Sequence, residues 1–279
     1  MVAVVVSFNG GEQLRVGVDA LLAQIEHVLV VDNGSEESSL AVLRDLETHP
    51  RVTVTRLGRN TGMGHALNVG VRFARERGFD WILTMDQDSV PQPSMVEAFR
   101  RAVERDPALA CLTPMRIGES ANDREPATPV RYAITSGNLV RMSVFERVGW
   151  YDEGLFVDCT DFDFSLRVRR AGFAICRVAD AAMTHQLGDA LDSSTPFRRF
   201  YARHSPSRRY YMYRNLLYIV RRYALVDPVF VAKLLINQTV MTLLVGLLDP
   251  QPLASYRAML RGVQDFFARR DGPMVMRAR

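Results

Sequence analysis

The sequence contains very little lysine and cysteine. Lys233 is the sole lysine among 279 residues, so nearly all of the 35 basic side chains are arginines. The three cysteines, Cys111, Cys159 and Cys176, are scattered and form no C-x-x-C pair. This spacing argues against a disulfide framework or a zinc knuckle, and it favours a reducing, cytoplasmic environment.

The sequence also lacks a signal peptide pattern and a long unbroken apolar run. It opens directly into the apolar run 2–6 with no basic segment before it, which is not how a signal peptide begins. The longest apolar stretch, Leu234–Leu248, has 15 residues and is interrupted by Asn237 and Gln238. A membrane span needs roughly 20 apolar residues, so we expect no spanning helix.

Composition is that of a soluble globular protein, with 48% hydrophobic and 24% charged residues and a net charge of only +4. A chain of this length can bury a sizeable core, either as one large domain or as one domain with an appendage. These totals place no strong constraint on the partner, so function has to come from local patterns.

The chain is organised around an apolar run, 81–85, that ends in two carboxylates. Asp86 and Asp88 follow this run two residues apart, and Pro91 and Pro93, which are unsuited to continuing a β-ladder, come next. The acids are therefore expected at the C-terminal end of a buried strand, where open α/β sheets bind ligands. Their hard oxygen atoms suit Mg²⁺ or Mn²⁺ that carries a phosphate. Alone, the D-x-D pattern is weak, because two loop acids in a turn look the same.

The first third of the chain alternates strand and helix patterns. We predict strands at 2–7, 28–31, 52–57 and 81–86, separated by helices at 13–24, 38–46 and 64–77. Repeated units of this kind imply parallel strands with helices on both faces of the sheet. The polar loops after the strands would meet at one edge, and we place a nucleotide there.

The middle of the chain is less regular. It predicts a helix at 95–104, a strand at 110–114, a polar loop at 118–129 and a short helix ending near Gly149. A further helix begins in the aspartate-rich segment 158–163 and stops at Gly172. Acids in a first turn suit the helix dipole, so capping is the ordinary explanation for Asp158, Asp161 and Asp163.

Residues 193–226 contain eight arginines, many aromatic residues and no acid. Such a segment fits a nucleic-acid surface, a phosphate clamp or a basic amphipathic helix on an anionic membrane. The apolar stretch 229–248 follows it, which favours the membrane surface over nucleic acid. We therefore divide the chain into a main domain, 1–192, and a basic and apolar helical extension, 193–279.

Seven short motifs in order carry a resemblance to a known family. They are Val-Ser-Phe-Asn (6–9), Val-Asp-Asn-Gly-Ser (31–35), Arg-Asn-Thr-Gly (59–62), Met-Asp-Gln-Asp-Ser (85–89), Thr-Asp-Phe-Asp-Phe-Ser-Leu-Arg (160–167), Thr-His-Gln-Leu-Gly (184–188) and Arg-Arg-Tyr-Tyr-Met-Tyr-Arg-Asn-Leu (208–216). The first six together resemble the inverting family 2 glycosyltransferases. Asp-Gln-Asp-Ser and the arginine–tyrosine motif look more narrowly like bacterial rhamnosyltransferases that use dTDP-L-rhamnose. The resemblance implies a GT-A fold, an α/β structure with a Rossmann-like nucleotide-binding half, a mixed central sheet and C-terminal helices.

The resemblance also implies roles for individual residues. The base would be held by Ser7, Phe8, Asn9 and Asp32, with Asn60 in the same pocket. Asp86 would contact the ribose, and Asp88 would bind the Mg²⁺ or Mn²⁺ that bridges the diphosphate. His185 would come near the metal. Further contacts with a phosphate or the acceptor would come from Asn138, Arg208, Arg209 and Arg214.

Asp161 would be the general base. The family commonly has Glu-Asp at 160–161, whereas this chain has Thr160, and Asp158 and Asp163 remain rival bases. The chemistry is consistent with one base, because a divalent cation can stabilise the leaving nucleoside diphosphate without a protein acid. A glycosidase, by contrast, needs a paired acid and base. We therefore expect inversion, from a β-L-rhamnosyl donor to an α-L-rhamnoside.

Three alternatives remain. The same fold could use a UDP-hexose or UDP-N-acetylhexosamine. The extension could be a non-enzymatic, membrane-binding module, which leaves the D-x-D pattern unexplained. A dinucleotide-binding oxidoreductase is supported only by Gly62-Met63-Gly64, because Leu67 stands where a third glycine is expected. As an enzyme, the chain is expected on the inner face of the bacterial cytoplasmic membrane, peripherally bound. It would act on a saccharide, glycolipid or lipid-linked acceptor, and a dimer is compatible with the sequence.

Overall fold

The computed structural model describes residues 1–116, 126–185 and 204–275 of the chain. These residues form two compact units. The first unit comprises Met1–Asp152 and Asp161–Gln186, and the second comprises Glu153–Thr160 and Leu187–Arg279. The short segment 153–160 therefore belongs with the C-terminal helices, although it is flanked on both sides by the first unit.

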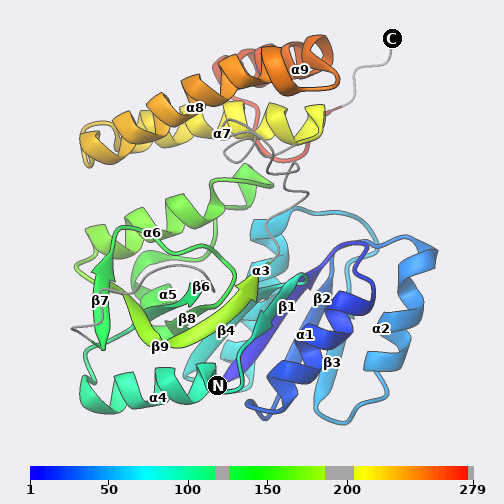
Figure 1. The fold of residues 1–279 in the computed structure, drawn as a ribbon, viewed down its shortest axis with the longest axis vertical. Coiled ribbons are helices and arrows are strands. Elements are labelled where there is room, and N and C mark those ends of the chain that lie inside the picture. Colours follow the sequence, from blue (N-terminus) through cyan, green and yellow to red (C-terminus); the bar gives the residue numbers. More distant parts are fainter. Residues whose placement is uncertain (117–125, 186–203, 276–279) are drawn as a thin grey trace. The chain divides into compact units, whose positions relative to one another are not determined.

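The first unit begins with the predicted parallel strands. They are β1 (Val2–Ser7), β2 (Val28–Asp32), β3 (Val52–Arg56) and β4 (Trp81–Asp86), in the spatial order β3-β2-β1-β4 (Figure 1). The connections run through α1 (Glu12–Leu22), the short 3-10 helix η1 (Glu37–Ser39) with α2 (Leu40–Leu46), and α3 (Met63–Glu76). The sequence predicted each of these elements within a few residues, because their apolar runs are separated by polar turns.

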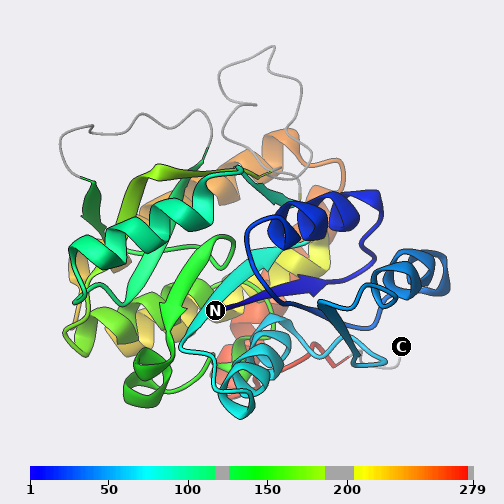
Figure 2. The same cartoon turned by 90° about the horizontal axis from the view of Figure 1, so that it is seen from below.

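The rest of the first unit makes the sheet mixed. Its strands are β5 (Ser89–Pro91), β6 (Cys111–Arg116), β7 (Ala127–Val130), β8 (Asn138–Arg141) and β9 (Ile175–His185), and its helices are α4 (Met95–Arg105), α5 (Met142–Val148) and α6 (Thr160–Arg170). The order continues from β4 through β8, β6 and β9 to β5, and β7 pairs with β9 (Figure 2 shows the cartoon from below). β8 is antiparallel to both β4 and β6, whereas β6 and β9 are parallel. The predicted mixed α/β sheet is confirmed.

Two local predictions were wrong. Pro91 was expected to end β structure, yet it lies in β5 opposite Met183. β5 is the edge strand of the sheet, and an edge tolerates a proline because one side of the strand needs no ladder hydrogen bond. Part of the predicted loop 118–129 is also a strand, since β7 pairs antiparallel with β9 from Ala127 to Val130. The rest of that loop, 117–125, lies outside the described residues.

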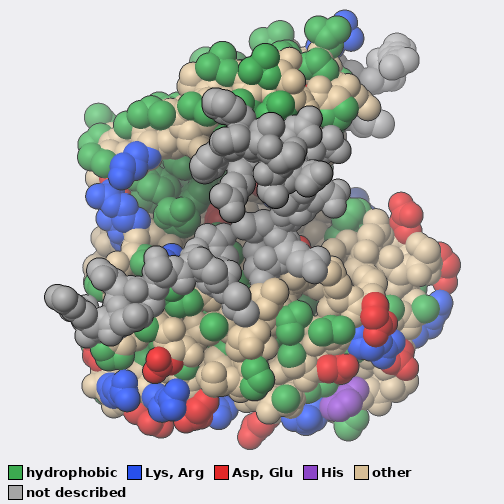
Figure 3. Space-filling view, in the orientation of Figure 1, with side chains coloured by type: hydrophobic (Ala, Val, Ile, Leu, Met, Phe, Trp, Pro, Cys, Tyr) green, Lys and Arg blue, Asp and Glu red, His purple; other side chains and the backbone are tan. Residues whose placement is uncertain are grey.

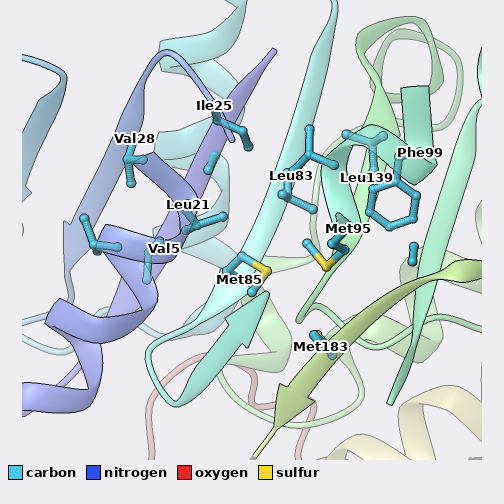
Figure 4. Close-up of a cluster of buried hydrophobic side chains, with 14 of the residues drawn as sticks. Val5, Leu21, Ile25, Val28, Leu83, Met85, Met95, Phe99, Leu139 and Met183 are labelled. Carbon is cyan, nitrogen blue, oxygen red and sulfur yellow. The ribbon is translucent and has the colours of Figure 1, made fainter. Parts of the chain in front are cut away.

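The sheet is buried on both faces, as its alternating side chains require. Ala3 and Val5 of β1 belong to one hydrophobic cluster, and Val2, Val4 and Val6 belong to the other. Figure 4 shows part of the first cluster, in which Leu21 and Ile25, from α1 and the turn after it, lie near the sheet residues Val5 and Leu83. Two layers of helices thus hold the strands in place and fix the positions of the strand ends.

Within its described residues, the second unit contains three helices after the 3-10 turn η2 (Glu153–Leu155). They are α7 (Pro206–Tyr223), α8 (Pro228–Leu248) and α9 (Pro252–Phe267). Each begins with proline in its first turn, where the missing N–H costs nothing. Ser205 and Asp227 cap α7 and α8, accepting from the amides of Arg208 and Phe230.

The length of α8 corrects a sequence prediction. Its 21 residues are long and apolar enough to cross a membrane, and only 11% of its most apolar window is buried within the protein. The apolar run starting at Leu234 gave 15 residues, but the helix begins six residues earlier, at Pro228. It therefore includes Val229, Phe230 and Val231 together with Lys233, whose charge had interrupted the apolar pattern.

Candidate functional site

The C-terminal ends of β1, β2 and β4 meet at one edge of the sheet, as the sequence predicted. Ser7 is in register with Asp32 across β1 and β2, and Val6 is in register with Asp86 across β1 and β4. The first residues after these strands are therefore neighbours, although they are far apart in the sequence. Most of the predicted donor-binding residues lie at this edge.

Asp32 ends β2 and shapes the turn that follows. Its side chain is buried, with 2% exposure, and its Oδ1 accepts from the amide of Ser35 at 3.1 Å and from the Ser35 hydroxyl. The Ser35 Oγ in turn accepts from the Asn9 amide at 2.8 Å, and the Asn9 Oδ1 accepts from the amide of Glu36 at 2.8 Å. The loops after β1 and β2 are thus bound to each other through the side chains of Ser35 and Asn9, and Asn9 is among the residues predicted to hold the base.

The loop after β3 joins the same network through Asn33. The Asn33 Oδ1 accepts from the amide of Thr61 at 2.8 Å, and its Nδ2 donates to Asn60 at 3.3 Å. Gly34 has φ +85, and a Cβ atom there would lie 2.3 Å from the carbonyl carbon of Arg59. Only glycine allows this close approach. Sequence reasoning identified Asn60 but missed Asn33, which is 5% exposed.

Gln87, the middle residue of the D-x-D pattern, binds the loop after β1. Its Oε1 accepts from the amide of Phe8 at 2.7 Å and from the Ser7 hydroxyl at 3.2 Å, and its Nε2 donates to the Phe8 carbonyl at 3.1 Å. These bonds extend the pairing of β1 with β4 beyond the register pair Val6 and Asp86. Sequence reasoning included Gln87 in the Asp-Gln-Asp-Ser motif but gave it no role of its own.

Asp86 and Asp88 lie at the end of β4 and are both half-buried. The Asp86 amide donates to the hydroxyl of Ser136 at 3.2 Å, and the Thr135 hydroxyl donates to Asp86 Oδ1 at 3.4 Å. Ser136 also donates to the hydroxyl of Ser89 at 2.6 Å. Residues 135–136 therefore support the acidic turn from the side opposite β1, a role that the sequence did not reveal.

His185 is brought to the acidic turn by strand pairing. Its backbone is in register with Ser89 across β5 and β9, next to Asp88 in the chain. For His185 the structure describes the backbone alone, and the rest of its motif, 186–188, lies outside the described residues. The register is compatible with the predicted place of His185 near the metal.

The three candidate bases have different surroundings. Asp163 is 1% exposed and forms an ion pair with Arg167 at 2.8 Å, one turn along α6. The Asp158 carboxylate accepts hydrogen bonds from two nitrogens of Arg208. Asp161, in the first turn of α6, is half-buried and accepts from the amide of Phe162 at 2.9 Å. Asp158 and Asp163 are thus each paired with a guanidinium group, and the assignment of the base to Asp161 stays a prediction.

The other predicted contacts lie elsewhere. Asn138 is 3% exposed in β8, where its side chain accepts from the thiol of Cys111 at 3.4 Å. Arg209 and Arg214, in the second unit, are 2% and 0% exposed. Arg209 pairs with Asp249 at 2.9 Å, and Arg214 donates to main-chain carbonyl oxygens. Arg208 is the most exposed of the three, with about half of its side chain accessible.

The residues at this edge fit a divalent cation that is bound partly by the protein and partly by the phosphates of a nucleotide substrate. No cluster of three or more His, Cys, Asp or Glu side chains occurs within 1–116, 126–185 and 204–275, so a cage made only of protein ligands is not evident there. Mg²⁺ in nucleotide enzymes is typically held by one or two carboxylates, with substrate phosphates and water as its other ligands. Asp88 fits the role of a single carboxylate ligand of this kind, with Asp86 two residues before it in the chain.

The comparisons with known proteins agree with this geometry. The family model described as "Glycosyl transferase family 2" matches residues 2–164. The dTDP-rhamnosyl transferase RfbF of Shigella flexneri is 29% identical over 247 residues, which cover 79% of each chain. The galactofuranosyltransferase GlfT1 of Mycobacterium tuberculosis is 26% identical over 249 residues, which cover 78% of this chain and 81% of that one.

Two solved structures share the fold. S. aureus TarS 1–349 in complex with UDP-GlcNAc has a TM-score of 0.63 at 17% identity, over 95% of this chain and 80% of that one. The mannosyltransferase PcManGT from Pyrobaculum calidifontis, in complex with GDP-Man and Mn²⁺, has a TM-score of 0.58 at 14% identity, over 95% and 86% of the two chains. The neighbours are GT-A glycosyltransferases, as the sequence motifs predicted.

Proposed function

Because this chain belongs to glycosyl transferase family 2, we propose that it transfers L-rhamnose from dTDP-L-rhamnose to a hydroxyl of a saccharide or lipid-linked acceptor. The observation that carries the proposal is that the C-terminal ends of β1, β2 and β4 meet at one edge of the sheet, where Asp86 and Asp88 lie. The choice of rhamnose rests on the similarity to RfbF over most of both chains and on the Asp-Gln-Asp-Ser motif.

The donor nucleotide lies on the loops after β1, β2 and β3. Asp32 Oδ1 is engaged by Ser35, so we assign Oδ2 to the imide N–H of thymine. Ser7, Phe8, Asn9 and Asn60 surround the base, and Asp86 contacts the ribose. Phe8 is 43% exposed, which leaves its ring free to stack on a flat heterocycle.

The diphosphate lies at Asp88, which would hold a Mg²⁺ or Mn²⁺ together with the phosphate oxygens, with His185 nearby. When bound, this ion would act as a Lewis acid and stabilise the charge of the departing dTDP. Its role explains why the site needs no protein acid to protonate the leaving group.

Asp161 acts as the general base. The acceptor oxygen attacks C1 of the rhamnosyl group from the face opposite the diphosphate, while the acceptor proton passes to the Asp161 carboxylate. The C1–O bond breaks, and its electron pair leaves with dTDP. The anomeric centre is therefore inverted, from the β-linked donor to an α-L-rhamnoside.

A thermal-shift comparison of dTDP, UDP and GDP, each with and without Mg²⁺, tests the donor site. Ligand binding to the folded protein raises the melting temperature in proportion to RT ln(1 + [L]/Kd). We expect the largest shift with dTDP, a dependence on metal, and loss of that dependence in Asp88→Ala. A larger shift with UDP than with dTDP would indicate a UDP-sugar as the donor in place of dTDP-L-rhamnose, and the fold assignment would stay unchanged.

Replacing the base tests the mechanism. Asp161→Asn should keep donor binding and lower turnover by about 10²–10⁴-fold, the usual contribution of a general base. Asp163→Asn is the matched comparison, since it should loosen the pairing with Arg167 without that loss of rate. Full activity in Asp161→Asn would assign the base elsewhere, and a β-linked product would refute inversion.

Another donor sugar is the second candidate. GlfT1 is similar over nearly the same share of the chain as RfbF, and its name specifies transfer of galactofuranose. The pyrimidine pocket proposed above would accept uracil as well as thymine, because both carry the same imide N–H. Product analysis with dTDP-L-rhamnose and UDP-sugars as competing donors separates the two.

The enzyme is proposed to act at the inner face of the cytoplasmic membrane, with α8 and α9 against the lipid. Ile236, Leu243 and Leu247 of α8 are 65%, 67% and 79% exposed, and Leu253 and Leu260 of α9 are 71% and 59% exposed. Figure 3 shows hydrophobic side chains gathered over these helices. Apolar surface of this extent marks a membrane or protein interface.

Charge favours a lipid surface over a second copy of the chain. Lys233 and Arg257 are exposed on α8 and α9, and no acidic side chain is exposed on either helix. A symmetric dimer through this face would oppose like charges, whereas anionic headgroups would attract them. Flotation with phosphatidylglycerol vesicles should carry the protein upward, and Leu243→Gln with Leu247→Gln should reduce this. A stable dimer in light scattering, without flotation, would favour the second copy.

A further inference from the structure

We propose that three residues of α7, Arg208, Arg214 and Asn215, are positioning residues for the catalytic base. They would act through the segment 153–160, which leads directly into Asp161. This inference rests on the proposed role of Asp161. It also gives a function to the arginine–tyrosine motif 208–216, whose buried arginines do not suit a phosphate.

The segment 153–160 has an unusual backbone. Phe156, Asp158 and Cys159 have φ values of 63, 61 and 64°, a left-handed conformation that residues with a Cβ atom rarely adopt. Three such residues among four persist only when surrounding contacts determine the conformation. The source of those contacts is therefore a question about function as well as about folding.

Asn215 supplies the first set of contacts. It is fully buried, and its Nδ2 donates to the carbonyl oxygens of Leu155 at 2.6 Å, Val157 at 2.6 Å and Asp158 at 3.1 Å. Its Oδ1 accepts from Arg214 Nε at 3.1 Å, which turns the amide nitrogen toward the segment. One side chain thus fixes three peptide groups of the left-handed stretch.

Arg214 supplies the second set. Its guanidinium donates to Gly154 and Leu155 at 3.0 and 3.2 Å, and also to the carbonyl of Gly272 at 2.7 Å. The Gly272 amide itself donates to the Gly154 carbonyl at 2.7 Å. The guanidinium is 0% exposed, so its positive charge is stabilised by these carbonyl dipoles rather than by water. It holds the start of the segment, as Asn215 holds the rest.

Two further contacts complete the attachment. Arg208 donates to Asp158 Oδ1 from Nε at 3.2 Å and from a terminal nitrogen at 2.9 Å, and its Nε also donates to Oδ2 at 3.3 Å, so the charge-assisted pairing involves both carboxylate oxygens. The Phe156 ring stacks on Tyr211, with centroids 4.9 Å apart. Residues 208, 211, 214 and 215 are spaced at three and four positions, so they share one face of α7.

The contacts of α7 with segment 153–160 affect the position of Asp161 through the covalent backbone. Cys159 is two residues before Asp161, and the residue between them, Thr160, is buried and begins α6. At the other end, Asn68 of α3 holds the main chain of Tyr151 through two hydrogen bonds, at 2.9 and 3.0 Å. If the α7 contacts were lost, the segment would relax toward ordinary φ values and the first turn of α6 would shift. A misplacement of about 1 Å at a catalytic group can lower a rate by about 10²-fold.

The test uses Asn215→Asp, which keeps the shape of the side chain but removes the two N–H donors that face the carbonyl oxygens. Arg208→Ala is a milder second variant, because Arg208 is half exposed. Tyr218→Phe is the matched control, since it removes a hydrogen bond from α7 to the carbonyl of Arg270 and leaves 153–160 untouched. Melting temperatures establish that each variant is folded.

Two readouts are measured. The first is alkylation of Cys159, which is half-buried in the segment, whereas Cys111 and Cys176 are buried. We expect its rate to rise at least about fivefold in Asn215→Asp and Arg208→Ala, because local opening exposes the thiol, and to stay unchanged in Tyr218→Phe. The second is hydrolysis of dTDP-L-rhamnose with Mg²⁺, in which the base takes the proton of water. We expect kcat to fall about 10- to 100-fold with KM within about twofold.

Asp161→Asn is measured in parallel and separates the two proposals. If Asp161→Asn loses turnover while Asn215→Asp and Arg208→Ala keep it, the positioning role is overturned and the base remains. If Asp161→Asn keeps turnover, the base assignment itself has failed, and the positioning role fails with it. Unchanged alkylation of Cys159 in both α7 variants would overturn the attachment directly, whatever the donor.

Discussion

Replacing Gln87 by alanine should weaken both the fold and nucleotide binding. The substitution removes the two hydrogen bonds with the Phe8 main chain, at 2.7 and 3.1 Å, and the bond with the Ser7 hydroxyl at 3.2 Å. Asp86 and Asp88 keep their positions in the sequence, so the change isolates the residue between the acids. The loop after β1 would then lose its attachment to the end of β4.

The expected size follows from the exposure of the groups involved. Phe8 is exposed, so water replaces much of what its main chain loses, and each bond contributes near the lower end of about 0.5–1.5 kcal/mol. The three bonds together stabilise the fold by about 1–2 kcal/mol, which corresponds to a decrease of about 2–8 °C in Tm for a unit of this size. If dTDP must order the same loop on binding, its Kd should rise by about 5- to 30-fold.

Calorimetric titration with dTDP and Mg²⁺, together with thermal melting, measures both effects. Gln24→Ala is the control, because it removes two glutamine hydrogen bonds to main-chain groups, those of Val96 and Ala20, beyond the C-terminal end of α1 and away from the nucleotide loops. A lower Tm with unchanged dTDP affinity would refute the reasoning, since it would mean that the Phe8 loop does not contribute to the pocket.

Three further predictions concern stability. Arg209→Met leaves the Asp249 carboxylate, 5% exposed, without its guanidinium partner. The free energy of unfolding measured in urea should decrease by about 3–5 kcal/mol, and adding Asp249→Leu should restore most of that loss. Burial beside Arg208 lowers the pKa of His204 from 6.5 to about 4. As the pH decreases from 6.5 toward 4, His204 is therefore protonated in the unfolded chain before it is protonated in the folded one, and the free energy of unfolding should decrease. Melting temperatures measured over this pH range should decrease less for His204→Asn than for the unchanged protein. Gly34→Ala should cost more than Gly58→Ala in the same assay, because both glycines have positive φ but only the Cβ at position 34 would meet the Arg59 backbone; equal losses would show that the close approach is relieved without cost.

The parallel half of the sheet could be predicted because its signals are local. The apolar runs of β1, β2 and β4 are bounded by polar turns, and strands of βαβ units have their C-terminal ends at one edge. The short edge strands were harder, since β5 and β7 contain Pro91 and Pro129 and owe their existence to pairing with β9. Such pairing is decided by residues at least 45 positions away.

The candidate site divides in the same way. Asp32 and Asp86 end β2 and β4, and Asp88 comes two residues after β4, so apolar runs followed by acids were enough to predict where these residues lie. Gln87 and Ser136 act on main-chain groups 79 and 50 residues distant, so no local pattern reveals them. The arginines of 208–214 were predicted to contact a phosphate or the acceptor because the segment is basic, but a run of positive charge does not tell which side of a helix is buried. Arg209 and Arg214 turned out to lie in the interior of the second unit.

The placement of 153–160 also bears on how such enzymes can be recombined. The segment is encoded within the first unit, yet its peptide groups are bound by α7 and by Gly272. A chimaera that exchanged only the C-terminal helices with those of a relative would pair a foreign α7 with the native segment. Chimaeras should therefore fold when segment 153–160 and the C-terminal helices come from the same parent, so an exchange of these helices would require a second exchange at 153–160.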